Sequence, residues 1–170
     1  MSKTLLPKYA FFVAGTGRHI DKLEAFDRAL INAGPLAHNL VSVSSIIPAG
    51  CKIVSPEKGF SMLIPGQITF CVMARQETNK PRDIASAAVG IAVPKESKKF
   101  GYISEYHGDA KDREEAKKTA KRMAAEMFAV KLNTNVKKLN LKTLEATAAS
   151  IKQRGDNEWV CAVAICVFVL

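Results

Sequence analysis

The sequence has few of the features that mark several common classes of protein. Only 7% of its residues are aromatic, so no stacking platform for single-stranded nucleic acid stands out. Its four cysteines show no Cys-x-x-Cys spacing and its three histidines are scattered, so no metal-binding constellation can be read. The amino-terminal residues lack the apolar core and cleavage site of a signal peptide. We therefore expect neither a bound metal nor secretion.

No apolar run is long enough to cross a bilayer. Residues 160–170 are strongly apolar, but this is about half of the roughly 20 residues that a membrane helix needs. We expect a buried strand there. All four cysteines stand beside apolar residues, which is typical of small buried thiols in a reducing compartment. These absences predict a cytoplasmic protein that does not bind a membrane.

Size and charge favour one folded domain with a solvated basic surface. A chain of 170 residues is long enough to bury about two thirds of its unfolded surface. The net charge of +9 raises nucleic acid as a partner, but acidic residues are interleaved with the cations of the predicted helix. We therefore favour a protein that binds no nucleic acid. A basic nucleic-acid-binding or assembly protein remains the alternative from a different functional class.

The first third of the chain predicts a strand, a turn, a helix and a second strand. Residues 9–13 have strand character, and Gly15-Thr16-Gly17 reads as a turn, because Ile20 stands where a dinucleotide motif needs its third glycine. A helix follows from Asp21 to the glycine stop at Gly34, with apolar residues at helical spacing at positions 23, 26, 30 and 31. Residues 38–47 then read as one strand that ends before Pro48, with a short continuation at 51–54.

The remainder predicts mostly strands and one long helix. Strand character recurs at residues 67–75, 83–93, 99–107, 139–151 and 158–170. The helix at 109–131 shows an apolar stripe of Ala116, Ala120, Met123, Met127 and Val130, and Glu114 is spaced to pair with Lys118. Many strands and two convincing helices indicate an α+β fold with two packed sheets and a helix on each outer face.

The serine pair Ser44-Ser45, inside an apolar extended run, calls for a chemical explanation. A buried serine needs a hydrogen-bond partner, so a folding argument alone favours valine or threonine there. One chemistry uses this arrangement: the Ser45 hydroxyl attacks the Ser44 carbonyl, the resulting ester eliminates, and hydrolysis leaves a ketone. The chain would then be cut into residues 1–44 and 45–170, with a pyruvoyl group at the head of the second piece. The alternative is a pair of strand-end hydroxyls bonded to the backbone.

The surrounding segments carry a specific family resemblance. Residues 24–34, Asn39-Leu40, residues 43–48 and residues 101–106 resemble, in order and spacing, the pyruvoyl-dependent arginine decarboxylases of the archaeal type. The resemblance runs over most of the chain, and the serine-pair segment is its most specific part. It implies a four-layer αββα sandwich of two mainly antiparallel sheets that assembles as a trimer. Whether two trimers then pair is not decided by the resemblance.

The resemblance also implies the activity and the cofactor. Decarboxylation of L-arginine to agmatine and carbon dioxide, plausible for polyamine synthesis, would use a pyruvoyl group formed from Ser45 and neither pyridoxal phosphate nor a metal. A ketone of this kind serves as the electron sink that no ordinary side chain offers. Because this chemistry is indifferent to the substrate side chain, a decarboxylase of another amino acid, such as histidine, remains the alternative within the enzyme class.

Three further site residues follow from the resemblance. Glu105 matches the acid that donates a proton to the substrate, and Asp27 matches the carboxylate that receives the arginine guanidinium. The alternatives are an edge carboxylate paired with a lysine for Glu105 and an exposed helical acid for Asp27. Asn39 also matches a site position, yet it would lie about 20 Å from Ser45 along an extended strand. We therefore predict composite sites at the trimer interfaces.

Overall fold

The computed structural model describes residues 4–35 and 37–170 as an α+β fold with two sheets. The first sheet, here sheet A, has the strand order β2-β5-β9-β1-β4, and the second, sheet B, has the order β3-β7-β6-β8. The strands are β1 (Tyr9–His19), β2 (Asn39–Ser42), β3 (Ile46–Ile47), β4 (Lys52–Ile53), β5 (Ile68–Thr78), β6 (Ile84–Pro94), β7 (Gly101–Gly108), β8 (Leu141–Lys152) and β9 (Trp159–Val169). The helices are α1 (Lys22–Ala33), α2 (Pro56–Phe60), α3 (Arg113–Lys131) and the 3₁₀ turn η1 (Val136–Lys138).

Both sheets are mainly antiparallel, as predicted. In sheet A the long strands β1 and β5 each pair antiparallel with the central β9, and the short edge strands β2 and β4 join in parallel. Every pairing in sheet B is antiparallel. The strand β9 is buried from Val160 to Val169 because it has neighbours on both edges and packed layers on both faces. The predicted α+β class is therefore confirmed.

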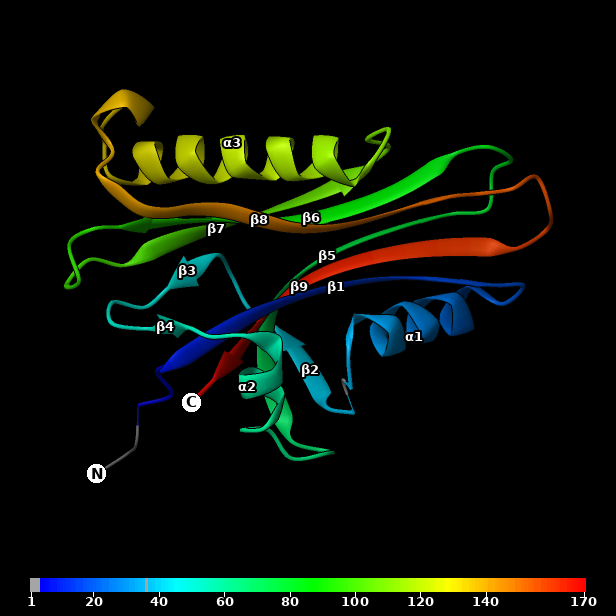
Figure 1. The fold of residues 1–170 in the computed structure, drawn as a ribbon, viewed down its shortest axis with the longest axis horizontal. Helices are drawn as coiled ribbons and strands as arrows, with labels where there is room; N and C mark the ends of the chain where they lie inside the picture. The colour runs from blue at the N-terminus through cyan, green and yellow to red at the C-terminus, as the bar shows by residue number, and fades with distance from the viewer. Residues whose placement is uncertain (1–3, 36) are drawn as a thin grey trace.

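The sheets pack against each other and each carries a helix, as Figure 1 shows. The core between the sheets combines small and branched side chains, among them Val72, Val89 and Ile103. Helix α1 packs on sheet A through a second cluster that includes Phe11 and Ala29, and α3 lies along sheet B. The chain therefore buries one face of each helix against one sheet.

Helix α1 follows its sequence signals closely. The Asp21 carboxylate accepts hydrogen bonds from the backbone N–H groups of Leu23 and Glu24, at 2.8 and 3.2 Å, and caps the first turn. At the other end, the Gly34 N–H donates to the Ile31 carbonyl, and Gly34 adopts a φ of 148°. The predicted start and stop of this helix are confirmed.

The glycine pair Gly15 and Gly17 is not the predicted turn. Both residues lie inside β1, on the face that α1 covers. A Cβ atom at Gly15 would come within 2.3 Å of the Ala29 carbonyl oxygen, and one at Gly17 within 2.2 Å of the Ala25 carbonyl oxygen. The glycines therefore let the helix backbone approach the strand more closely than any side chain permits.

Helix α3 buries a different stripe of residues from the one predicted. Its Met127 and Val130 side chains are exposed, at 40% and 79% of their full accessible area. The residues that are buried are mostly alanines: Ala116, Ala120, Ala124, Ala125, Phe128 and Ala129. Small side chains let α3 lie close to β6, where a Cβ at Gly90 would stand 2.2 Å from the Ala120 carbonyl oxygen. Close approach thus replaces the predicted methionine packing.

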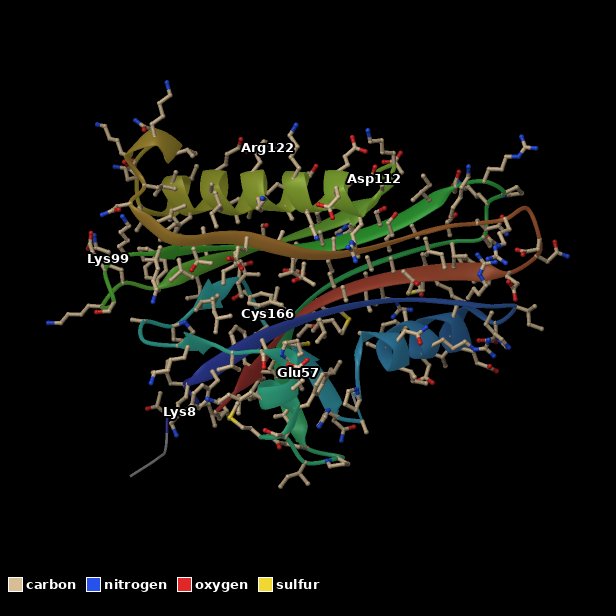
Figure 2. All side chains as sticks on the ribbon, viewed as in Figure 1. Lys8, Glu57, Lys99, Asp112, Arg122 and Cys166 are labelled. Carbon is tan, nitrogen blue, oxygen red and sulfur yellow. The ribbon has the colours of Figure 1, made fainter. Side chains whose placement is uncertain are left out.

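Charged side chains lie on the outer side of α3, while Cys166 lies within the sheets (Figure 2). Glu114 pairs with Lys117 at 3.0 Å, so the predicted pairing with Lys118 is wrong.

All four cysteines are free, and Cys71, Cys161 and Cys166 are buried whereas Cys51 is half-buried. Burial raises the pKa of Cys161 to about 12. Among the described residues, no helix is long and apolar enough to cross a membrane.

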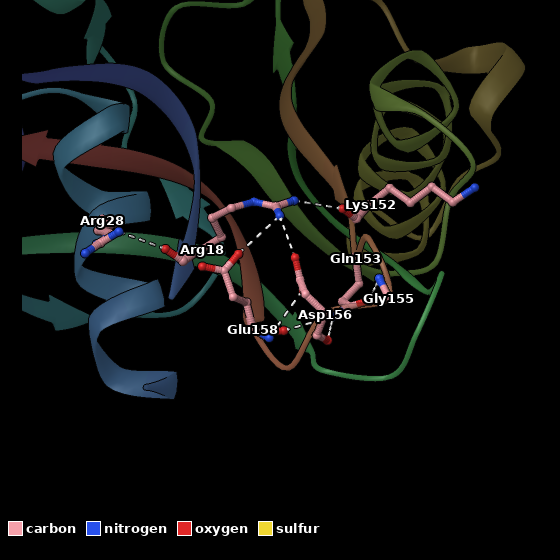
Figure 3. Close-up of polar contacts among 7 residues, drawn as sticks. All are labelled: Arg18, Arg28, Lys152, Gln153, Gly155, Asp156 and Glu158. Carbon is pink, nitrogen blue, oxygen red and sulfur yellow. Dashed lines mark hydrogen bonds and ion pairs between the residues drawn. The ribbon is translucent and has the colours of Figure 1, made fainter. Parts of the chain in front are cut away.

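The turn between β8 and β9 is held by a buried glutamine (Figure 3). The Gln153 side chain is 0% exposed; its amide donates to the Asp156 carboxylate at 2.8 Å and accepts from the Gly155 N–H. Arg18 of β1 reaches the same turn and pairs with Asp156 and Glu158 at 3.5 and 3.3 Å. This polar cluster fixes one end of the sandwich.

The predicted strand over residues 38–47 is two short strands in different sheets. Strand β2 pairs with β5 in sheet A, and β3 pairs with β7 in sheet B. The intervening residues 43–45 carry the chain from one sheet to the other. The alternation of polar and apolar residues does not predict this change of sheet, because both short strands have the pattern of an extended chain.

Candidate active site

The serine pair lies at the crossing between the two sheets. On one side, the Val43 N–H donates to the Cys71 carbonyl of β5 at 2.8 Å, which is a bond to sheet A. On the other side, the Ser45 carbonyl accepts from the Ile103 N–H of β7 at 2.8 Å, which is a bond to sheet B. Ser44 stands between these two anchors and is exposed, whereas Ser45 is half-buried. The Ser44–Ser45 peptide therefore lies between one backbone hydrogen bond to sheet A and one to sheet B.

A tight bend is centred on Ser45. The Ile46 N–H donates to the Ser44 carbonyl at 3.0 Å, which is the i to i+2 hydrogen bond of a γ-turn. Positive φ angles among the described non-glycine residues occur at Arg82 and Asn133, so Ser45 has a negative φ and the turn is of the inverse type. The oxygen of the carbonyl before Ser45 is thus in contact with a hydrogen-bond donor.

Glu105 lies on β7, near the strand segment that anchors Ser45. Ser45 bonds to Ile103, and Glu105 follows two residues later, about 7 Å further along an extended strand. Ile103 belongs to the core between the sheets, and the Ser104 hydroxyl points the other way and donates to the Ala120 carbonyl at 2.7 Å. By the alternation of a strand, Glu105 faces sheet A on the same side as Ile103.

The surroundings of Glu105 favour its protonated form. Burial raises the pKa of this half-buried carboxyl above its ordinary value of 4.5, and the charge of His107 offsets part of that rise. In the described part of the chain, Glu105 forms no ion pair, which differs from the alternative of a lysine-paired edge carboxylate. Its charge also contributes to the raised pKa of Cys71 on sheet A, after burial of that thiol. Glu105 is therefore a desolvated acid between the two sheets.

Asn39 begins β2 and is held by backbone on both sides. Its side-chain amide donates to the Gly66 carbonyl at 2.8 Å, and its own N–H donates to the Gln67 carbonyl at 2.9 Å. Because the chain crosses between sheets after Ser42, the straight strand that placed Asn39 about 20 Å from Ser45 does not exist. Strand β2 nevertheless keeps the chain extended from Asn39 to Ser42, over about 10 Å, so the composite site at Asn39 stays a prediction.

Asp27 lies apart from the other predicted residues within one chain. It is exposed on α1, whose buried residues Ala25 and Ala29 face the outer side of sheet A. Glu105 belongs to sheet B and faces the inner side of sheet A, so sheet A separates the two carboxylates. The hydrogen bond between Ser45 and Ile103 links the serine pair to β7, the strand that carries Glu105. Asp27 lies on the other side of sheet A and is not brought to them.

Two hollows of the described surface lie away from the predicted site residues. One, of about 630 Å³, is lined by Arg18, Arg82, Ile151 and other residues at the β8–β9 end of the sandwich. A hollow of about 380 Å³ lies between α1 and β1, at Gly17 and Asn32. Neither is lined by Ser45, Glu105 or Asp27. The candidate site of a single chain therefore lies outside these two hollows.

Two features of the candidate site were not predicted from the sequence. His107, which the sequence did not single out, lies two residues after Glu105, and its charge lowers the pKa of that carboxyl. The i, i+2 spacing on a predicted strand is a signal that could have revealed this neighbour. The contact of the Ile46 N–H with the Ser44 carbonyl has no such signal, because it depends on a bend that only the change of sheet creates.

The arrangement suits a rearrangement of the Ser44–Ser45 peptide. It contains a hydroxyl adjacent to a carbonyl, a donor on that carbonyl oxygen and a desolvated acid nearby. A pyruvoyl group made from Ser45 fits these residues, since its backbone would stay anchored by Ile103. In residues 4–35 and 37–170, no group of three or more histidine, cysteine or acidic side chains is placed to hold a metal ion.

Comparisons with known proteins point to one family. The family model for pyruvoyl-dependent arginine decarboxylases matches residues 9–170. Pyruvoyl-dependent arginine decarboxylase 1 of Methanosarcina acetivorans is 38% identical over all of both chains. Pyruvoyl-dependent arginine decarboxylase 2 of Archaeoglobus fulgidus is 45% identical over 98% of this chain and 99% of its own. The enzyme of Methanococcoides burtonii is 49% identical over 75% of this chain and 71% of its own.

Proposed function

The chain belongs to the family of pyruvoyl-dependent arginine decarboxylases, and we propose that it converts L-arginine to agmatine and carbon dioxide with a pyruvoyl group made from its own Ser45. One observation carries the proposal beyond the family: the chain crosses between its sheets at Ser44–Ser45, with a backbone donor on the Ser44 carbonyl at 3.0 Å. A strand-end serine pair needs no such bend. The bend supports self-cleavage between residues 44 and 45.

The proposed self-cleavage balances without a metal or an external oxidant. The Ser45 hydroxyl attacks the Ser44 carbonyl carbon, and the peptide C–N bond breaks as the hydroxyl proton passes to the Ser45 nitrogen, which leaves an ester. Loss of the proton on the Ser45 Cα then expels the ester oxygen as the Ser44 carboxylate. Water replaces the remaining nitrogen, which departs as ammonia. The products are residues 1–44 and a ketone at the head of residues 45–170.

Glu105 is proposed to supply a proton to the substrate. A pyruvoyl group provides the electron sink that decarboxylation of an amino acid requires. Once carbon dioxide has left, the substrate Cα needs a proton, and a carboxyl with a raised pKa retains one closer to neutral pH. The half-buried position of Glu105 between the sheets also limits the access of water. Its location two residues beyond the anchor of Ser45 supports this role.

Asp27 and Asn39 are proposed to bind arginine across the interfaces of a trimer. Within one chain, sheet A separates Asp27 from Glu105, so a second chain is the simplest source of a guanidinium-binding carboxylate. A carboxylate accepts the planar fork of arginine through two hydrogen bonds. We propose four-layer αββα protomers assembled as cytoplasmic trimers, with pairing of trimers as a further step. The exposure of Ser44 beside the half-buried Ser45 supports completion by a neighbour.

The mass of the denatured protein tests the self-cleavage. We expect two fragments cut between Ser44 and Ser45, the second one ammonia lighter than simple hydrolysis leaves it. Ser45→Ala removes the nucleophile and should remain a single chain, whereas Ser44→Ala keeps both the hydroxyl of residue 45 and the attacked carbonyl and should still cleave. A wild-type chain that stays whole under conditions in which it is folded would contradict the proposal and favour the basic binding-protein alternative.

Substrate choice is tested at Asp27. Loss of a charged hydrogen-bonding partner costs about 1.5 to 3 kcal/mol, so Asp27→Asn should raise the KM for arginine by roughly tenfold or more. Glu24→Gln, an exposed acid on the same helix that pairs with His19, is the matched control and should leave the KM near the wild-type value. An unchanged KM in Asp27→Asn, or faster turnover of histidine than of arginine by the wild type, would contradict the assignment.

A further inference from the structure

The carbonyl of Ser44 is the group that the proposed self-cleavage must activate, and the structure gives it one backbone donor. We infer that the Ile46 N–H stabilises the negative charge that develops on the Ser44 carbonyl oxygen during self-cleavage. The inference rests on the proposed function, since it concerns the step that makes the cofactor. It is carried by the 3.0 Å contact between the Ile46 nitrogen and the Ser44 oxygen.

The pairing of β3 with β7 leaves this N–H free for the task. Ile46 is opposite Tyr102 and Ile47 is opposite Gly101, and Ser45 continues the register opposite Ile103, with which it shares a hydrogen bond of 2.8 Å. In an antiparallel pair, hydrogen-bonded and non-bonded positions alternate, so the Ile46 position is a non-bonded one. Its N–H points away from β7 and towards the Ser44 carbonyl. The sheet therefore orients the donor without using it.

The charge develops where the donor already lies. Attack of the Ser45 hydroxyl closes a five-membered ring through the Ser44 carbonyl carbon and moves the electron pair of the C=O bond onto oxygen. When the ring reopens, that pair returns to the C=O bond, and the C–N bond breaks as nitrogen takes the hydroxyl proton. A fixed N–H strengthens its hydrogen bond as the oxygen becomes negative and needs no rearrangement. The ground-state contact becomes stronger in the transition state.

The same contact distinguishes the two serines. Attack by Ser44 on the preceding carbonyl, that of Val43, would form the same kind of ring and the same kind of ester. The γ-turn supplies its donor to the Ser44 carbonyl alone. The bend therefore selects the Ser44–Ser45 bond, and the Val43–Ser44 bond stays intact.

The test removes one backbone N–H and keeps every side chain. Residue 46 is replaced by the α-hydroxy analogue of isoleucine, which exchanges the N–H for an oxygen, and the appearance of the pyruvoyl-headed fragment is followed over time by mass spectrometry under denaturing conditions. The matched control is the α-hydroxy analogue of valine at position 43, whose N–H donates to the Cys71 carbonyl at 2.8 Å on the other side of the serine pair. Both analogues lose one hydrogen bond of the crossing segment.

We expect the analogue at position 46 to slow cleavage on the order of a hundredfold, the effect of removing one oxyanion donor, and the analogue at position 43 to slow it much less. Equal rates for the wild type and the position-46 analogue, or equal slowing by both analogues, would overturn the inference and leave self-cleavage standing. A wild-type chain that never cleaves would overturn both.

A crystal structure of the Ser45→Ala precursor provides a second measurement that does not depend on the folding of the analogues. Because this variant cannot cleave, it keeps the chain whole at the bend. The inference requires the Ile46 nitrogen to lie within hydrogen-bonding distance of the Ser44 oxygen there. An Ile46 N–H directed to any other acceptor would contradict it.

Discussion

The central strand β9 and the crossing segment from Asn39 to Ile47 show opposite solutions to the same problem of placing extended chain. Strand β9 is flanked by β1 and β5 and is buried along nearly its whole length. The crossing segment pairs with β5 for four residues and with β7 for two, and most of it is exposed. The two regions contact the same sheets and yet differ in how much of their backbone is fixed.

The difference separates stability from chemistry. A strand that is hydrogen-bonded on both edges and packed on both faces contributes to the global stability and has little freedom to react. The crossing segment is anchored at Val43 and at Ser45, and the peptide between these anchors belongs to neither sheet. Bond rearrangement at Ser44–Ser45 requires such a segment, which can change its covalent structure while the rest of the fold persists.

The largest expected effect compares the two regions directly. Ile165→Ala on β9 removes a fully buried side chain and should lower the free energy of unfolding by about 3 kcal/mol, because it leaves a cavity. Val41→Ala on β2, where the side chain is 40% exposed, should cost below about 1 kcal/mol. Urea unfolding in the Ser45→Ala background, where the chain stays whole, measures both. Equal losses of unfolding free energy would show that the crossing segment is packed as tightly as β9.

A somewhat smaller effect is expected where β1 meets α1. Gly17→Ala places a methyl group against the backbone of α1 and should destabilise the fold by roughly 2 kcal/mol, as overpacking does. Thr16→Ala, on the neighbouring residue of the same strand, adds no atoms and serves as the control. Thermal unfolding of the two variants distinguishes them. If Gly17→Ala is as stable as the wild type, α1 does not rest on the strand as described.

The smallest effect concerns the pH dependence of stability near the crossing. Because burial raises the pKa of Glu105, the folded chain binds this proton more tightly than the unfolded chain. The stability that it contributes is present below the ordinary pKa of 4.5 and is lost as pH rises through the higher folded-state pKa. Between pH 4 and pH 8, Ser45→Ala should therefore lose more stability than the double variant Ser45→Ala/Glu105→Gln.

Urea unfolding of these two chains at several pH values measures that difference. Gln cannot titrate, so its curve should be the flatter one, while the packing around position 105 is nearly unchanged. Parallel curves would show that Glu105 is solvated in the folded state, and they would remove the physical basis for its proposed role as a proton donor. The same variant in the cleavable chain reports whether turnover depends on Glu105.

Local patterns predicted the elements that depend on neighbouring residues. The limits of α1 followed from Asp21 and Gly34, because capping is satisfied within one turn of the chain. The predicted strands over 83–93 and 158–170 are also present, since small or uniformly apolar residues suit a strand that is buried on both faces. Two of the wrong expectations, Gly15-Thr16-Gly17 as a turn and Met127 as a core residue, concern contacts between elements far apart in sequence.

The sequence by itself determined the α+β class, the serine pair and the family, because each is expressed in residue types at fixed spacing. Only the tertiary structure decided that residues 38–47 divide between two sheets, that Ser45 occupies the centre of a tight bend and that sheet A separates Asp27 from Glu105. The physical reason is that an extended strand has one local pattern whichever sheet it joins. Which partner it finds depends on backbone hydrogen bonds and burial across the whole chain.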